Sequence, residues 1–269
     1  MLIHFTRTID ALDSILRNGF LYLHNETEVL GPVAQEALGI NADCQSNGMI
    51  CFTELPQSNL SSHQNYFGRF GVGVAKDWLI QKNAKKVVYV SVGSEVYKAM
   101  VIRMKSLVPK TLCGKRTDEL LACQETRYMA IRDLTNIEFA KLSGASLEYQ
   151  DFLESFEWMQ TDAHVAEMEW RIRNPKPYRF SGQPNRQQQI ELLVNCVSDP
   201  NIQATCEGMQ KYTVDCRVEL ILTGKSSLVL PLPKEQIRAI FCPEDNAPLI
   251  RDAFLNAGLG HIPIITSPD

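Results

Sequence analysis

Apolar and polar positions follow two different periods at the start of the chain. Residues 2–6 alternate between the two kinds of side chain, which predicts a strand with one buried face. A stripe with helical spacing follows directly, formed by Ile9, Leu12, Ile15 and Leu16. Thr8 precedes this stripe as a candidate N-cap, and Gly19 follows it as a helix terminator. The first twenty residues therefore predict a strand, a tight turn and a helix.

Further apolar runs bounded by Gly, Pro or Asn predict the other strands. These runs cover residues 21–23, 49–53, 70–74, 86–92, 218–222, 228–232, 237–241 and 261–265. We expect residues 218–222 and 228–232 to pair as a hairpin, and residues 244–257 to form a helix before the last strand. Residues 26–48 are expected to be a partly helical loop, and the Gln-, Asn- and Pro-rich residues 174–215 to be mainly loop.

The pattern becomes helical between about residue 94 and about residue 160. We interpret this stretch as a helical insert that packs on the sheet. No linker-like segment divides the chain cleanly, so the sequence predicts one domain over residues 1–269. Strand pairs combined with inserted helices favour an α+β fold over a regular alternation of strands and helices.

Charge and composition narrow the classes of function. Lys and Arg number 27 against 31 Asp and Glu, a net charge of −4. This balance argues against non-specific binding of nucleic acid, although it leaves room for a local basic patch. One candidate patch is the run of Lys98, Arg103, Lys105, Lys110, Lys115 and Arg116. Such a run could bind phosphate, or it could simply be a solvated helix face.

Cysteine and histidine spacing predicts no metal site. The eight cysteines include no C-x-x-C pair, and the five histidines are dispersed. Scattered cysteines without a signal peptide indicate reduced thiols, and no apolar run reaches the length of a membrane span. We therefore expect a cytoplasmic protein that does not enter the membrane.

The most acidic candidate site lies within residues 163–173, AHVAEMEWRIR. If this stretch is extended, Glu167 and Glu169 share one face about 7 Å apart, and two like charges so placed acquire unequal pKa values. Unequal carboxyl groups suit acid–base chemistry. In the alternative interpretation, the two acids pair with Arg171 and Arg173 across a solvated face.

Three blocks of sequence carry a resemblance to known families. Residues 3–19, IHFTRTIDALDSILRNG, resemble the opening of ADP-ribosyltransferase-type domains, with a histidine on the first strand and an L-x-x-I-L-x-x-G helix. Residues 49–79, with CFTELP and YFGRFGVGVAKDWL, are similar to AbiGi-type abortive-infection proteins of bacterial phage defence. The terminal P-E-D helix and G-x-x-H-I-P-I-I strand fit the same group. The order of these blocks implies an ADP-ribosyltransferase-like fold with two small bent β-sheets around an NAD cleft.

The resemblance also implies which residues contact NAD. His4 would bind the adenosine-side ribose, with Thr6 beside it. Tyr66 would lie against the nicotinamide, with Phe67 nearby. Arg69, between two glycines, could bind phosphate or could be solvated. Without the resemblance, the histidine is explained equally well as a core-edge residue, and the two aromatic residues as core.

The E-x-E triplet falls where such transferases carry their catalytic glutamate. Glu169 would stabilise the oxocarbenium-like centre that forms when the nicotinamide–ribose bond breaks. Glu167 would accept the proton of the attacking nucleophile. For this chemistry His4, Tyr66 and Glu169 must converge on one cleft, and we expect NAD as substrate without a metal.

The resulting hypothesis is an ADP-ribosyltransferase toxin of a phage-defence system with a cognate antitoxin or regulator. Its expected acceptor is nucleic acid, RNA or DNA, with a protein acceptor as the alternative. The second hypothesis is a non-catalytic antitoxin that neutralises a partner through its surface. The third, a metal-dependent nuclease using Glu167 and Glu169, lacks a further acidic ligand at suitable spacing.

Overall fold

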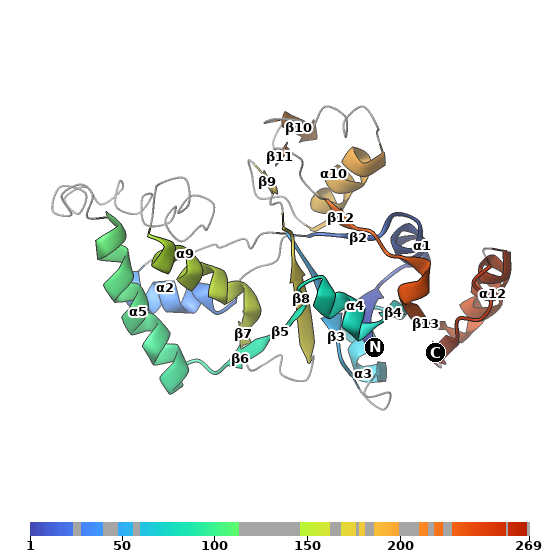
Figure 1. The fold of residues 1–269 in the computed structure, drawn as a ribbon, viewed down its shortest axis with the longest axis horizontal. Helices are drawn as coiled ribbons and strands as arrows, with labels where there is room; N and C mark the ends of the chain where they lie inside the picture. Colours follow the sequence, from blue (N-terminus) through green and yellow to red (C-terminus); the bar gives the residue numbers. More distant parts are fainter. Residues whose placement is uncertain are drawn as a thin grey trace. The chain divides into compact units, whose positions relative to one another are not determined.

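The chain folds into two compact units (Figure 1). The first unit comprises residues 1–23, 47–86 and 167–269, and the second comprises residues 24–46 and 87–166. The computed structural model describes the chain except for residues 24–27, 40–47, 56–59, 113–145, 162–167, 176–177, 181–185, 199–209, 215–217, 223–227, 257 and 268–269.

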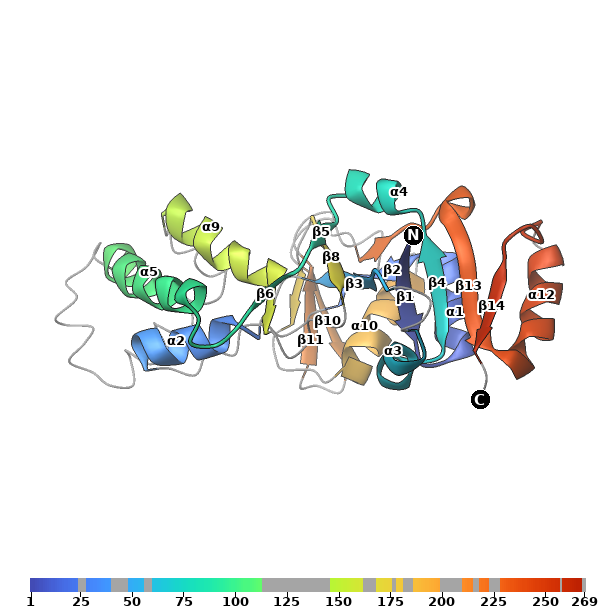
Figure 2. The same cartoon turned by 90° about the horizontal axis from the view of Figure 1, so that it is seen from below.

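A seven-stranded sheet forms the centre of the first unit, and several of its strands lie side by side in Figure 2. Its spatial order is β14 (Ile264–Ser267), β13 (Ile237–Pro243), β4 (Phe70–Val74), β1 (Leu2–Thr6), β3 (Met49–Thr53), β8 (Glu169–Arg173) and β5 (Lys85–Lys86). Neighbouring strands are antiparallel except β13 and β14, which are parallel and connected through α12 (Ala247–Asn256). The predicted strand–helix–strand ending is therefore confirmed.

The two faces of this sheet bury different clusters. The face that carries Leu2 packs into the larger core, with side chains from α1 (Ile9–Asn18), α4 (Lys76–Gln81), α10 (Arg186–Ser198) and α12. The opposite face buries the smaller cluster of Ile3, Ala239 and Phe241. Helix α3 (Leu60–Phe67) lies on this second face, because its His63 ring contacts Phe5 with 5.3 Å between ring centroids.

The opening strand–helix pattern is confirmed in detail. Thr8 caps α1, and its hydroxyl accepts a hydrogen bond from the Ala11 amide at 3.2 Å. The helix ends where the Gly19 amide donates to the Ile15 carbonyl at 2.8 Å, with φ of 93° at the glycine. Glycine is required here because β2 (Phe20–Leu21) then pairs with β12 (Val229–Leu230), and a Cβ would overlap the Leu230 carbonyl.

Two predictions for residues 174–232 are wrong. The stretch expected to be mainly loop contains α10 together with β9 (Tyr178–Phe180) and β10 (Gln210–Val214). The expected hairpin does not form, since β11 (Val218–Leu222) pairs with β9 and β10 whereas β12 pairs with β2. Short 3₁₀ helices complete the first unit at Lys234–Gln236 and Glu244–Asn246.

Three helices form the core of the described part of the second unit. Helix α5 (Glu95–Leu112) packs against α2 (Leu30–Leu38) and α9 (Leu147–Ser155), as Figures 1 and 2 show. Its core contains Val29, Leu30, Val33, Ala34, Val90, Tyr97, Met100, Val101, Met104, Leu107, Tyr149, Phe152, Leu153 and Phe156. A 3₁₀ turn (Phe156–Trp158) leads into β7 (Met159–Thr161), which pairs in parallel with β6 (Val88–Val90).

The boundary between the units divides the strand predicted at residues 86–92. Its first part is β5, which pairs with β8 in the first unit, and its second part is β6 in the second unit. The helical insert expected near residues 94–160 falls within the second unit, which also includes residues 24–46, and its middle part, residues 113–145, lies outside the described residues. The α+β fold class is confirmed, whereas the ADP-ribosyltransferase-like arrangement of two bent sheets stays a prediction.

Candidate functional site

Glu169, proposed from the sequence as the catalytic carboxylate, is held by a buried ion pair on β8. Arg171 lies two residues further on the same strand face. Its Nε donates to one carboxylate oxygen of Glu169 at 3.0 Å, and its Nη2 donates to the other at 2.9 Å. The two residues are only 6% and 4% exposed. Both carboxylate oxygens thus have charged donors from within the chain, which is typical of a structural ion pair.

The backbone just before β8 departs from the extended conformation on which the shared face of Glu167 and Glu169 was conditional. Met168 has φ of 46°, in the left-handed region, and its carbonyl accepts a hydrogen bond from the Glu54 amide at 3.1 Å. The strand starts only at Glu169. The condition of an extended backbone through residues 163–173 is therefore not met at Met168. Glu167 itself lies outside the described residues, so its predicted role as accessory acid stays a prediction.

His4 packs into the larger core of the first unit. Its Nδ1 donates to the Cys51 carbonyl at 2.8 Å. Its ring meets those of Phe20 and Phe52 edge-on, with centroids 5.2 and 5.8 Å away. Thr6 lies two residues further along β1 and therefore on the same sheet face. The interpretation of His4 as a core-edge histidine matches this environment.

Strand register separates His4 from Glu169. Ile3 pairs with Thr53, and Thr53 pairs with Glu169, so these three side chains share one face of the sheet. Because side chains alternate along a strand, His4 lies on the opposite face. The structure therefore does not bring the proposed ribose-binding histidine and the proposed catalytic glutamate together.

Helix α3 presents two aromatic side chains to solvent. Tyr66 is 78% exposed and Phe67 is 41% exposed. Tyr66 is therefore not a core residue, which is how it was explained without the family resemblance. The Phe67 ring stacks on His63 with 4.4 Å between centroids, and His63 in turn contacts Phe5 of β1. Arg69 lies two residues after the end of the helix, beyond Gly68, and is partly buried. His63 thus connects the exposed end of α3 to the central sheet.

Because His63 is partly buried, the free energy of unfolding is expected to depend on pH. Desolvation lowers the pKa of His63 from 6.5 to about 4. As pH falls below 6.5 the unfolded chain binds a proton that the folded chain does not, so we expect stability to decline from pH 6.5 to about 4. The free energy of unfolding measured against pH for wild type and His63→Gln tests this, because the variant should lack that part of the slope. An unchanged slope would contradict it.

A second cluster joins Glu54, Lys76 and Trp170, and the sequence analysis missed it. Lys76 Nζ is 2.5 Å from one Glu54 carboxylate oxygen and 4.6 Å from the Trp170 ring centroid. Trp170 Nε1 donates to the other oxygen at 2.9 Å. Burial raises the pKa of Glu54, but hydrogen bonds from Lys76 and Trp170 and nearby lysine charges outweigh it, so the net pKa is lowered. The sequence carries no local signal for this cluster, because the cluster depends on the register that pairs Trp170 with Phe52, two residues before Glu54.

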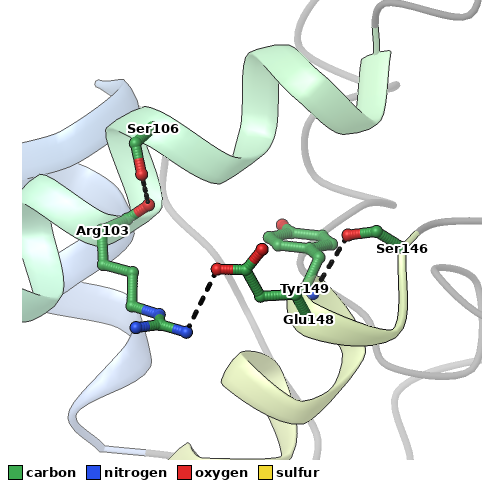
Figure 3. Close-up of polar contacts among 5 residues, drawn as sticks. All are labelled: Arg103, Ser106, Ser146, Glu148 and Tyr149. Atoms are coloured by element: carbon green, nitrogen blue, oxygen red, sulfur yellow. Dashed lines mark hydrogen bonds and ion pairs between the residues drawn. The ribbon is translucent and has the colours of Figure 1, made fainter.

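Two cations of the basic run are paired with acidic side chains. On α5, Lys98 pairs with Glu95 at 2.8 Å, and Arg103 pairs with Glu148 of α9 at 3.3 Å (Figure 3). Lys115 and Arg116, at the end of the run, lie outside the described residues. No group of three or more His, Cys, Asp or Glu residues in the described ranges could hold a metal ion. None of the helices described is long and apolar enough to cross a membrane.

Among the candidate site residues of this α+β protein, Glu169 is bound by Arg171 of the same chain, whereas Tyr66 and Phe67 are exposed. The model of one family, putative abortive phage resistance protein AbiGi, antitoxin, matches residues 34–178, or 145 of the 269 residues. The chain therefore belongs to the AbiGi family. No curated protein and no solved structure matches it.

This family assignment corrects the main functional hypothesis from the sequence. The family is described as an antitoxin, so the interpretation of the chain as an ADP-ribosyltransferase toxin that modifies nucleic acid is wrong. The resemblance to AbiGi-type proteins and the assignment to phage defence are confirmed. NAD binding through His4, Thr6, Tyr66, Phe67 and Arg69 stays a prediction.

Proposed function

We propose that the protein is the non-catalytic antitoxin of an abortive-infection pair and neutralises a cognate protein partner by binding it. The family description carries this proposal, since it applies to more than half of the chain. The matched residues 34–178 include α3, the segment that exposes Tyr66 and Phe67. A binding protein of this kind needs a surface with anchor residues and no reactive centre.

The surface of α3 around Tyr66 is the proposed contact with the partner. Tyrosine and arginine are enriched among residues that dominate binding energy, because they combine apolar area with directional donors. Tyr66 and Phe67 offer that area, with Arg69 beside them. The stack of His63 on Phe67 restrains the helix face before binding, which lowers the entropy lost on association.

The environment of Glu169 supports a role without catalysis. A catalytic carboxylate must face its substrate, whereas the oxygens of Glu169 both accept hydrogen bonds from the buried Arg171. Neutralisation by binding makes no demand on this carboxylate. Glu169 then contributes to function only by stabilising the sheet.

Rescue of growth tests the proposal directly. The protein would be co-expressed with the product of its neighbouring gene, which should arrest growth when expressed alone. We expect the wild type to restore growth and to bind that product. Tyr66→Ala should weaken binding by about 2 kcal/mol or more, roughly thirtyfold, and reduce rescue.

Leu255→Ala is the matched control, because it removes an exposed apolar side chain from α12 in the same unit. This control should bind and rescue as the wild type does. Equal rescue by Tyr66→Ala would remove α3 as the contact surface. Failure of the wild type to protect cells from the neighbouring product would overturn the antitoxin function itself.

A further inference from the structure

The outward face of helix α5 carries exposed apolar side chains among the charged Glu95, Lys98, Arg103 and Lys105. Its inner side chains, among them Met100 and Met104, are buried in the core of the second unit. On the outward side Val96 is 57% exposed and Ile102 is 66% exposed, with the exposed Ala99 between them. An amphipathic helix normally directs charged or polar residues outward, so these apolar positions indicate a contact surface.

Two pairs of side chains on this face are placed symmetrically about Ala99. Val96 precedes Ala99 by three residues and Ile102 follows it by three. Glu95 precedes it by four residues and Arg103 follows by four. When two such helices cross antiparallel at Ala99, residues equally far from the crossing lie at the same level. Glu95 and Arg103 are close to the centre of the face, so the glutamate of each copy can reach the arginine of the other, while Val96 and Ile102 flank these pairs.

The residue at the centre is also suited to a close crossing. Alanine lets two helix backbones approach, while valine and isoleucine on either side fill the space between them. Glu95 lies at one end of the face and Arg103 at the other. Opposite charges of two copies therefore meet only when the helices are antiparallel. We propose that two copies of this chain associate through α5 about a two-fold axis at Ala99. This inference is independent of the proposed antitoxin function.

Existing ion pairs on α5 do not oppose this arrangement. Glu95 holds Lys98 at 2.8 Å, and Arg103 holds Glu148 at 3.3 Å (Figure 3), but all four side chains are more than half exposed. Exposed pairs contribute little stability, so exchanging them costs little. Arg103 also has a planar fork of donors that can serve a second carboxylate without releasing Glu148. A single helix pair buries a small area, so the dimer should be weak and concentration-dependent.

Charge reversal gives a test with an internal rescue. Sedimentation velocity over a wide concentration range should show a monomer–dimer equilibrium for the wild type. Glu95→Arg places arginine against arginine and Arg103→Glu places glutamate against glutamate, so each variant alone should be monomeric. An equimolar mixture of the two variants pairs opposite charges at both contacts, and should therefore form a heterodimer.

Three further variants separate this effect from changes in folding. Ile102→Glu should abolish association without changing the melting temperature greatly, because the side chain is exposed. Glu148→Gln removes the internal partner of Arg103, and Leu249→Glu adds a charge at an exposed apolar position on α12; both should still dimerise. A wild type that stays monomeric throughout, or a mixture of reversed variants that fails to dimerise, would overturn the proposal.

Discussion

Glu169→Ala is expected to destabilise the first unit by about 3–5 kcal/mol, because it removes both carboxylate acceptors from a buried arginine. Arg171 is only 4% exposed and directs Nε and Nη2 at Glu169. Without the carboxylate, its charge stays in a poorly hydrated environment. Urea unfolding followed by circular dichroism and tryptophan fluorescence measures the loss, since Trp78 and Trp170 report on the first unit and Trp158 on the second.

A double variant distinguishes a charge effect from a packing effect. Glu169→Leu combined with Arg171→Met removes both charges and keeps apolar volume, so its stability should lie close to that of the wild type. Glu169→Leu alone should remain strongly destabilised. If the double variant is as unstable as the single one, the ion pair is not the cause, and shape at this position matters more than charge.

Elements set by local patterning could be predicted from the sequence. Strand β1 and helix α1 follow directly from the alternation in residues 2–6 and from the stripe and cap behind Thr8. Strands β3 and β4 have the predicted bounds because each is a short apolar run between turn-forming residues. In these segments the local preference agrees with the environment that the fold provides.

Elements set by distant partners could not be predicted. Residues 86–92 form one apolar run, yet the chain changes units within it, and no local feature marks that change. Strand β12 pairs with β2 although β11 precedes it closely in sequence. Helix α10 begins in a Gln-rich stretch that resembles a loop, and its buried Leu192 and Leu193 are stabilised by the core of the first unit.

The same distinction between local patterning and distant partners applies to the candidate site. The sequence offered two interpretations of Glu169, a catalytic carboxylate or a partner of Arg171 on a solvated face. The structure has the pair with Arg171, but the pair is buried, because burial depends on what covers the sheet. Alternation alone could not reveal that Met168 turns the backbone before the strand. The separation of His4 from Glu169 likewise depends on the register of three strands.

Gly68→Ala is expected to destabilise the first unit and to displace the end of α3. Gly68 ends α3 with φ of 114°, a conformation that costs a residue with a Cβ about 1–3 kcal/mol. A Cβ there would also overlap the backbone carbonyl of Thr6, which belongs to the paired strand β1 and cannot move aside. The helix end must then shift, and it carries Tyr66 and Phe67 with it.

Gly258→Ala is the matched control for Gly68→Ala, because it separates conformational strain from overlap. Gly258 also lies in the first unit and has φ of 72°, but nothing lies within 4 Å of the position its Cβ would take. This control should lose only the conformational term, about 1–2 kcal/mol, and should still rescue growth against the neighbouring gene product. Gly68→Ala should lose more stability and also lose rescue, because the proposed contact surface is displaced. Urea unfolding and the co-expression assay measure the two effects separately. Equal losses in both variants would show that the backbone around Thr6 yields, and that α3 is not fixed by its approach to β1.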